Sequence, residues 1–358
     1  MRREILLNPG PVTLSDRVRA AMMKPDLCHR EKEFSALCLE ILKMISEVYP
    51  QAKEFQPVML TGSGTSAVEA MLQSFASSKK KSLIAANGVY GERMAAMLTK
   101  QGKPFNLIKG EWTEGVDLAA LESNLKQDAA NYHAILVVHH ETTTGRLNPI
   151  EPVAALGKKY GVPVMIDAVS SFAAEEIPFD NVLAVAATGN KCLHSIPAIS
   201  FVLARRDLLD AGASESKSLY LDLFEYYKAQ KGGFSPFTQS VQGVYALHEA
   251  LKEFFDMGGL SQRRKIYHSR RDRVLDLLQS LGVKTLIARD TFSSYLTSFL
   301  MPEGKSYDAL HDNLKENGFT IYAGQGNFSG KIFRIAVMGD IRENEMESLL
   351  KLLRQNLA

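Results

Sequence analysis

Lys191 is the residue whose position most strongly suggests chemistry. It follows the apolar run 182–187, which predicts a buried strand, and it stands in the short sequence Thr-Gly-Asn-Lys-Cys at 188–192. Burial lowers the pKa of a lysine amine, and the neutral amine can attack a carbonyl carbon to form a Schiff base. The structural alternative is a lysine that leaves the end of a strand into water, so the other polar groups of the chain must decide between the two.

Asp167 ends another predicted strand, 164–167. A carboxylate in this position can keep a heterocyclic nitrogen protonated, or it can serve only as a turn former or a helix cap. Because the strands of one parallel sheet end at the same edge, we expect Asp167 and Lys191 to open on one crevice.

The glycine-rich stretch 61–66 (Thr-Gly-Ser-Gly-Thr-Ser) lies between a predicted strand and a predicted helix. Free backbone N–H groups and the helix dipole make such a turn an anion site. Gly62, Gly64 and Ala67 fit the dinucleotide pattern G-x-G-x-x-A, but the next strand leads to Asn87 instead of the acidic residue that would bind a ribose. The hydroxyl groups among the glycines favour a phosphate-binding turn over a purely structural one.

Two further features point to the same crevice. The loop 141–145 (Glu-Thr-Thr-Thr-Gly) follows the predicted strand 134–139 and presents polar side chains, although ordinary turn chemistry also explains it. Tyr90 has a ring that can stack on a planar ligand or pack in a core. His139 and His140 have no ligand spacing with other His, Asp or Glu residues, so we predict no metal site.

Predicted strands and helices alternate from residue 57 to about residue 205. Apolar strands that alternate with helices predict an α/β fold with a mostly parallel, seven-stranded sheet that is covered on both faces. The strands that we expect in this sheet are 57–60, 82–86, 107–109, 134–139, 164–167, 182–187 and 199–203.

After residue 205 the pattern changes. A polar, aromatic segment, 218–237, precedes a helical stretch, 238–281, with a break expected at Gly258-Gly259. The strands and helices that follow predict a smaller C-terminal α+β domain. We therefore expect three parts: an N-terminal segment 1–20, a large domain 21–245 and a small domain 246–358.

Composition excludes some classes of protein. The 358 residues include 42 Lys and Arg and 40 Asp and Glu, a net charge of +2 that gives no nucleic-acid or membrane signal. No apolar run is long enough for a membrane span or a signal peptide. Cys28, Cys38 and Cys192 fit neither a disulfide framework nor a zinc site, which suits a reducing cytoplasm. We expect a cytoplasmic protein.

Taken together, these stretches resemble the class V aminotransferases, which belong to the fold type I pyridoxal-phosphate enzymes. Within that class the chain looks most similar to the enzymes that use 2-aminoethylphosphonate and pyruvate. The resemblance runs from the sequence Asn-Pro-Gly-Pro at 8–11 to the region of Arg334. The stretches that carry it are 62–65, 87–91, 141–150, 167–172 and 190–192.

The resemblance implies a site for pyridoxal 5'-phosphate. Lys191 would form the Schiff base with this cofactor and later shuttle a proton, and Asp167 would pair with the pyridinium nitrogen. Tyr90 would stack on the ring. The other cofactor contacts that the resemblance implies are those of Ser63, Gly64, Thr65, Thr142 and Asn190.

Two more implied roles concern the substrate and a second subunit. Arg334 would hold the anionic group of the substrate, because a guanidinium fork suits a carboxylate or a phosphonate. Thr238 would reach the phosphate of the neighbouring subunit's cofactor, which implies a homodimer with active sites at the subunit interface.

The implied reaction moves the amino group of 2-aminoethylphosphonate to pyruvate and gives phosphonoacetaldehyde and L-alanine. Asn190 and the three threonines favour it, whereas His140 and the stretch 194–198 depart from the usual pattern. The alternatives are an alanine–glyoxylate or serine–pyruvate aminotransferase, an aminophosphonate ammonia lyase and a non-catalytic ligand-binding protein. A cysteine desulfurase is disfavoured because no cysteine follows Cys192.

Overall fold

A seven-stranded sheet forms the centre of the larger part of the protein. The computed structural model describes residues 3–358. Six of the seven strands run in one direction and β10 is antiparallel to both of its neighbours, so the predicted mostly parallel sheet is confirmed. In spatial order the strands are β2 (Phe55–Thr61), β10 (Ile199–Arg205), β9 (Val182–Thr188), β8 (Val164–Asp167), β5 (Tyr132–Val138), β3 (Lys81–Ala86) and β4 (Phe105–Lys109).

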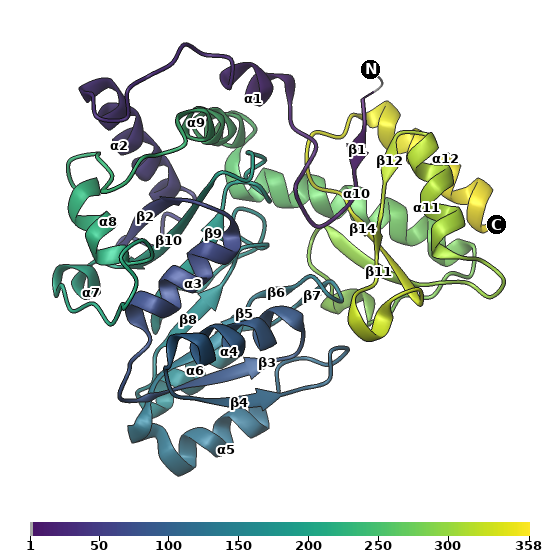
Figure 1. The fold of residues 1–358 in the computed structure, drawn as a ribbon. Helices are drawn as coiled ribbons and strands as arrows, with labels where there is room; N and C mark the ends of the chain where they lie inside the picture. The colour runs from purple at the N-terminus through teal and green to yellow at the C-terminus, as the bar shows by residue number, and fades with distance from the viewer. Residues whose placement is uncertain (1–2) are drawn as a thin grey trace.

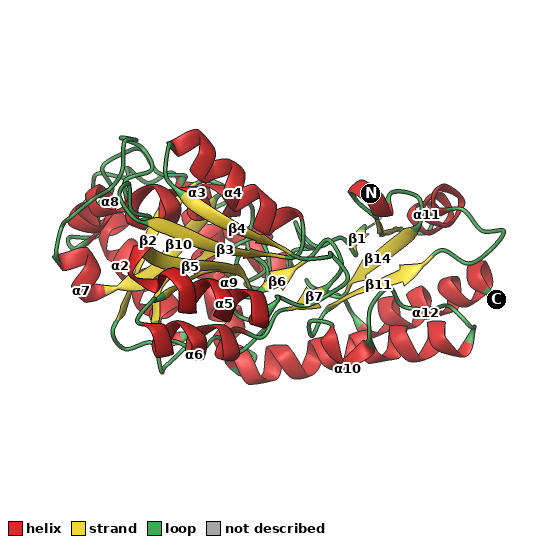
Figure 2. Ribbon diagram, turned by 90° about the horizontal axis from the view of Figure 1, so that it is seen from below, coloured by secondary structure: helices red, strands yellow, loops and turns green. Residues whose placement is uncertain are grey.

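Helices cover both faces of this sheet, as Figure 2 shows. Alternate residues of one strand enter different cores: Leu83 and Ala85 of β3 pack in one, and Ile84 and Ala86 in the other. This alternation is what the two-residue period of a strand requires. The first core includes side chains of α2 (Lys32–Glu47), α5 (Leu118–Asp128), α6 (Ile150–Tyr160) and α9 (Val241–Asp256). The second includes side chains of α3 (Gly64–Phe75), α4 (Val89–Gln101), α7 (Arg206–Asp210) and α8 (Leu223–Gln230).

A smaller three-stranded sheet lies at the other end of the molecule (Figure 1). Its order is β11 (Leu296–Leu300), β14 (Ile332–Ala336) and β13 (Tyr322–Ala323), all antiparallel. The helices α11 (Tyr307–Glu316) and α12 (Glu343–Leu357) belong to this end, and the long helix α10 (Gly259–Ser280) reaches it from the large sheet. The predicted boundary near residue 245 falls inside α9, and the division of the chain into three parts stays a prediction.

The first described residues of the chain pack with the part of the protein that contains the small sheet. After β1 (Ile5–Leu6), which pairs in parallel with β12 (Phe319–Thr320), the chain returns towards the large sheet through α1 (Asp16–Ala21). Ser15 caps α1 by accepting a hydrogen bond from Val18 N. The N-terminal chain therefore bridges the two ends of the molecule (Figure 1).

Three features are absent from the sequence prediction. Helix α8 lies within the segment 218–237, where its N-cap Asp222 accepts from the N–H of Phe224. The hairpin of β6 (His140–Glu141) and β7 (Arg146–Leu147) frames the threonine loop. The pairing of β1 with β12 joins residues that are distant in the chain. By contrast, the break expected at Gly258-Gly259 separates α9 from α10 as predicted.

None of the helices between residues 3 and 358 combines the length and the apolar character that crossing a membrane requires.

Candidate active site

The ends of β8 and β9 bring Asp167 and Lys191 to the same edge of the large sheet. The two strands are parallel neighbours, with Asp167 opposite Ala186. Both strands are buried along their whole length, and Lys191 comes three residues after the end of β9. The two strand ends therefore lie side by side, as the sequence predicted, and a crevice shared by Asp167 and Lys191 stays a prediction.

Lys191 is largely enclosed by protein. Its Nζ donates a hydrogen bond to the carbonyl oxygen of Pro9, in the loop after β1. Burial lowers the pKa of the Lys191 amine to about 8, while the charges of Cys192 and Asp167 raise it and that of Arg334 lowers it. With this pKa, about a tenth of the amine is neutral at pH 7, far more than at the ordinary lysine value, and the neutral form is the one that acts as a nucleophile or a base.

Asp167 is a buried carboxylate that lacks an ion pair within the described residues. Its Oδ1 accepts a hydrogen bond from Val169 N at 3.0 Å. Burial raises its pKa to about 6, against the lowering effect of that hydrogen bond and of the charges of Arg93 and Lys191. Such a carboxylate gains stability from a cationic partner, for example a protonated ring nitrogen.

One pocket contains Asp167 and three more of the predicted cofactor residues, Gly64, Thr65 and Tyr90. About 270 Å³ of its space is not filled by atoms. Its other lining residues are Val68, Arg93, Met94, Met97 and Val169.

The N-terminus of α3 forms one wall of this pocket. Ser63 is the N-cap, but its side chain makes no capping hydrogen bond, and the hydroxyl groups of Ser63 and Thr65 are exposed. A side chain at Gly64 would have its Cβ 2.4 Å from Cγ1 of Val169, so the close approach of helix and loop requires glycine. Free hydroxyls and N–H groups at a helix N-terminus suit a phosphate.

Tyr90 lies in the first turn of α4, facing the same pocket. The guanidinium of Arg93, one turn further, lies 4.7 Å from the centre of the Tyr90 ring. Asn87, just before the helix, is fixed by hydrogen bonds with Asn148 and with the carbonyl of Glu114. These hydrogen bonds hold the turn before α4, and with it the position of Tyr90 at the start of the helix.

The threonine loop is buried, and its backbone binds Arg334. The Thr142 carbonyl accepts a hydrogen bond from Arg334 Nη1 at 2.6 Å. Nε and Nη2 of Arg334 donate to the carbonyl of Ala323 at 3.0 and 2.6 Å. These bonds use three of the five N–H groups of the guanidinium, so one on each terminal nitrogen has no partner among residues 3–358. Burial lowers the pKa of Arg334, but an arginine remains charged.

Six predicted site residues are not part of the lining of this pocket: Ser63, Thr142, Asn190, Lys191, Thr238 and Arg334. Thr238 is exposed, between α8 and α9, and its neighbour Gln239 accepts from the hydroxyl of Thr61 at 2.9 Å. Asn190 is buried and accepts from the hydroxyl of Thr188 at 2.7 Å. Asn190 therefore shapes the turn before Lys191 in this chain, and Thr238 faces outward.

Sequence reasoning missed Arg93, Pro9 and Gly10 as site residues. Arg93 follows Tyr90 by three positions, which places the two on one face of a helix, so helical spacing could have indicated it. Nothing local to the sequence Asn-Pro-Gly-Pro shows that Pro9 and Gly10 contact Lys191, because that contact depends on the path of the chain after β1.

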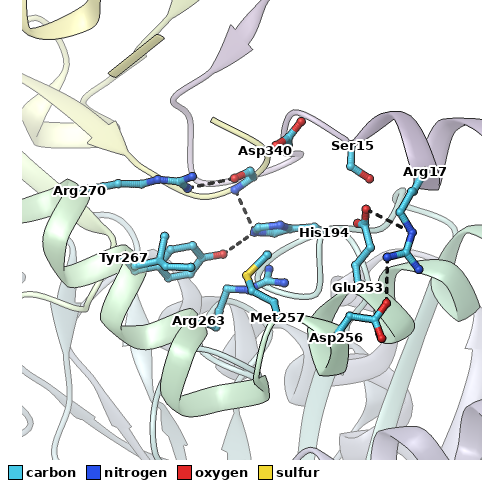
Figure 3. A pocket seen from close by; sticks show the side chains of 12 residues that line it. Ser15, Arg17, His194, Glu253, Asp256, Met257, Arg263, Tyr267, Arg270 and Asp340 are labelled. Carbon is cyan, nitrogen blue, oxygen red and sulfur yellow. Dashed lines mark hydrogen bonds and ion pairs between the residues drawn. The ribbon is translucent and has the colours of Figure 1, made fainter. Parts of the chain in front are cut away.

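A larger cavity, about 810 Å³, lies behind the loop that follows Lys191 (Figure 3). None of the predicted site residues lines it. In Figure 3 His194 and Tyr267 point toward each other; their Nε2 and hydroxyl are 2.5 Å apart, and Nε2 also accepts from Gly339 N at 2.9 Å. Arg263 Nη1 donates to the carbonyl of Cys192 at 2.7 Å. This cavity therefore holds contacts that fix the lysine loop against α10.

The carboxyl edge of the large sheet thus brings together four chemical groups. Its pocket supplies a buried carboxylate without a cation, a helix N-terminus that suits an anion and an aromatic ring, and the loop after the neighbouring strand β9 supplies an amine with a lowered pKa. Together they fit a flat heterocycle that carries an aldehyde, a basic ring nitrogen and a phosphate.

Comparison with known proteins agrees with this geometry. A family model described as aminotransferase class V matches residues 17–342. The chain is 33% identical to the 2-aminoethylphosphonate–pyruvate transaminase of Phocaeicola vulgatus, over 99% of each chain. It is 34% identical to the protein of the same name from Klebsiella pneumoniae, over 98% of this chain and 96% of that one.

Solved structures share the fold. An aspartate aminotransferase of subgroup IV from Thermus thermophilus superposes with a TM-score of 0.90 at 26% identity, over 99% of both chains. An alanine–glyoxylate aminotransferase from Nostoc superposes with a TM-score of 0.91 at 24% identity, over 100% of this chain and 96% of that one.

Proposed function

The chain belongs to the class V aminotransferases, and on that premise we propose that it transfers the amino group of 2-aminoethylphosphonate to pyruvate, with phosphonoacetaldehyde and L-alanine as products. The observation that carries the proposal is that relatives named for this reaction match the chain from end to end at 33–34% identity. The fold supports it, because a lysine and a carboxylate of the required kinds follow or end two neighbouring strands at the same edge of the sheet.

The fold is that of the fold type I pyridoxal-phosphate enzymes, and the family's cofactor fits the residues of the pocket. We assign the phosphate to Ser63, Gly64 and Thr65 at the N-terminus of α3, the face of the ring to Tyr90 and the ring nitrogen to Asp167. Thr142 and Asn190 complete the proposed cofactor site. When bound, pyridoxal phosphate supplies a carbonyl group for the amine and a ring that withdraws electrons from the amino carbon.

Lys191 supplies the acid–base chemistry in this proposal. With a pKa of about 8, its Nζ can take a proton from the substrate carbon that bears the amino group and can later give a proton back. Asp167 keeps the ring nitrogen protonated, because the buried carboxylate is stabilised by that positive charge. These two residues are the proposed catalytic pair.

Arg334 is the proposed anchor for the substrate's anionic group. Its fixed guanidinium has one N–H on each terminal nitrogen free of protein partners within the described residues, a fork that suits a phosphonate or a carboxylate. The same arginine can thus serve both half-reactions, since both 2-aminoethylphosphonate and pyruvate are anions.

We also propose a homodimer in which Thr238 of each subunit contacts the cofactor phosphate held by the other. Thr238 is exposed, and so are the apolar side chains Leu219 (76% exposed) and Tyr220 (41%). Tyr220 donates to the carbonyl of Thr61, which places this apolar surface beside the phosphate-binding turn. A partner subunit that covers these side chains would lie next to the phosphate.

A subunit-mixing experiment tests the dimer. We expect Lys191→Ala and a Thr238→Glu variant each to lose activity alone. Mixed dimers should regain part of it, because one of their two sites combines an intact lysine with an intact Thr238. A monomer by light scattering, or mixed samples without activity, would contradict the proposed shared site.

For the cell compartment we propose the cytoplasm. The three cysteines are all free, Cys28 exposed and the other two buried, as a reducing environment would keep them.

The reaction is tested with the purified protein. We expect a visible absorption band from the lysine-bound cofactor, lost in Lys191→Ala, and loss of that band on adding 2-aminoethylphosphonate alone. A colourless protein that binds no pyridoxal phosphate would overturn the enzyme assignment. Conversion by alanine or serine but not by 2-aminoethylphosphonate would identify an alanine–glyoxylate or serine–pyruvate enzyme. Ammonia release without a keto acid would identify a lyase.

A further inference from the structure

Glu141 is a fully buried carboxylate beside the cofactor pocket that the proposed reaction does not use. We propose that Glu141 is a positioning residue whose carboxylate ties the start of the Tyr90 helix to the threonine loop that holds Arg334. The aromatic surface for the cofactor and the arginine for the substrate are then fixed as one unit. This inference rests on the function proposed above for Tyr90 and Arg334.

One carboxylate oxygen serves the start of α4. Oε2 of Glu141 accepts a hydrogen bond from Tyr90 N at 3.1 Å. The N-cap of this helix is Gly88, which has no side chain to accept from the first N–H groups. Glu141 therefore supplies, from another part of the chain, the acceptor that an N-cap residue usually provides, and the helix dipole favours its negative charge.

Gly88 makes room for that carboxylate. A Cβ at position 88 would lie 2.2 Å from Cδ of Glu141 and 2.5 Å from its Oε2. The sequence Asn-Gly-Val-Tyr-Gly at 87–91 and the sequence Glu-Thr-Thr-Thr-Gly at 141–145 are therefore matched by a direct contact. Position 88 must be glycine because the side chain of Glu141 occupies the space that a Cβ atom would need.

The other carboxylate oxygen serves the threonine loop. Oε1 of Glu141 accepts from Thr143 N at 3.2 Å and from Thr143 Oγ1 at 2.6 Å. The backbone carbonyl of Glu141 also accepts from Gly145 N at 2.9 Å, which closes the turn. Both the side chain and the main chain of Glu141 thus hold this loop in one conformation.

The loop in turn binds Arg334 through the carbonyl of Thr142, the residue between Glu141 and Thr143. The path from the ring to the arginine is therefore continuous: Tyr90 N, the Glu141 carboxylate, the threonine turn and the guanidinium. A shift of the Glu141 carboxylate would therefore move both Tyr90 and Arg334.

Burial disfavours the charged form of Glu141, and the hydrogen bonds that its carboxylate accepts partly offset this cost. Burial raises the pKa of Glu141 to about 7, the hydrogen bonds from Thr143 and Tyr90 lower it, and the charge of Asp167 on β8 raises it further. Arg334 on β14 faces it, but forms no ion pair with it. Glutamine has the same shape and no buried charge, yet its amide nitrogen cannot accept a hydrogen bond. Only a carboxylate can accept on both sides.

The test compares Glu141→Gln with the matched variant Glu175→Gln. Glu175 is a second buried glutamate that accepts a hydrogen bond from Ser294 N, pairs with Arg264 and does not line the pocket. We expect Glu141→Gln to weaken the affinity of the apoprotein for pyridoxal phosphate about tenfold, the effect of one lost hydrogen bond, and to raise KM for the amino donor by a similar factor with less change in kcat. Glu175→Gln should change both quantities less than twofold.

Two further variants separate positioning from folding. Gly88→Ala displaces the carboxylate and should weaken cofactor affinity in the same direction. Combined with Arg334→Lys, Glu141→Gln should raise KM by less than the product of the two single effects, because both disturb one unit. Unchanged cofactor affinity and KM in Glu141→Gln would overturn the proposal, and so would equal losses in Glu175→Gln or independent effects in the double variant.

The cofactor titration uses no substrate, so it distinguishes failure of this proposal from failure of the proposed reaction. If 2-aminoethylphosphonate is not a donor, the KM comparison is made with the amino acid that does convert the cofactor. A normal titration in Glu141→Gln would then still count against the positioning role.

Discussion

Gly10 and Lys191 are in direct contact: a Cβ at position 10 would lie 2.5 Å from Cδ and 2.6 Å from Nζ of the lysine. The carbonyl of the preceding residue, Pro9, accepts the hydrogen bond of the lysine amine. The N-terminal chain, anchored by β1 on β12, therefore covers the reactive amine from the side of the small sheet. Access to Lys191 depends on this turn as well as on the strand ends.

Replacing Gly10 by alanine should push the lysine away from its present position. Gly10 has φ +106°, so the substitution also strains the backbone. We expect a 10- to 100-fold loss of kcat, on the order of 1–3 kcal/mol in the barrier, with weaker cofactor binding. The control is Gly102→Ala, which has a positive φ of +67° but no atom within 4 Å of the added carbon. Equal losses in both variants would show that only backbone strain matters.

The pKa of Lys191 can be read from the rate at which the apoprotein combines with pyridoxal phosphate. Only the neutral amine attacks the aldehyde, so we expect the rate to rise with pH and to level off above about pH 8, where burial has placed this pKa. Stopped-flow absorbance measures the rate, and Lys191→Ala gives the baseline. An inflection near 10.5, the ordinary value, would contradict the desolvated amine.

Asp167→Asn should stabilise the cofactor-free protein and inactivate the enzyme. Because burial raises the folded-state pKa from 3.8 to about 6, the folded protein loses stability as pH rises through that window. Removing the charge should therefore stabilise the folded protein by up to about 3 kcal/mol at pH 8 and by roughly half as much at pH 5. Thermal unfolding of the apoprotein at both pH values measures this. A larger gain at pH 5, or full activity in the variant, would contradict the assigned role.

The central sheet and the positions of Asp167 and Lys191 at its edge could be predicted because their signals are local. Apolar runs predicted the strands, and Asp167 and Lys191 follow two strand ends that a parallel sheet brings to one edge. Arg93, Pro9 and the carboxylate contacts of Glu141 could not be found in this way. Each depends on segments distant in the chain: the hydrogen bond from Lys191 to Pro9 spans 182 positions. Such contacts follow from the packing of the two sheets, which no local pattern specifies.

Arg334→Lys should separate charge from geometry in substrate binding. The guanidinium donates to two carbonyls, those of Ala323 and Thr142, and only a planar fork can do so while it presents further N–H groups to an anion. Lysine keeps the charge but loses the fork. We therefore expect KM for 2-aminoethylphosphonate and for pyruvate to rise 10- to 100-fold, a loss of about 1–3 kcal/mol, with kcat less affected.

The matched control for this arginine is Arg271→Lys. Arg271 also donates to a backbone carbonyl, that of Ser293 at 2.9 Å, and lies on α10 outside the pocket lining. It should change KM less than twofold, because lysine there loses only hydrogen bonds to Ser293 and Asp272, neither of which lines the pocket. If Arg334→Lys instead leaves KM unchanged for both anions, the anchor is another cation. Arg93, which lines the cofactor pocket and forms no ion pair within the described residues, is then the residue to test.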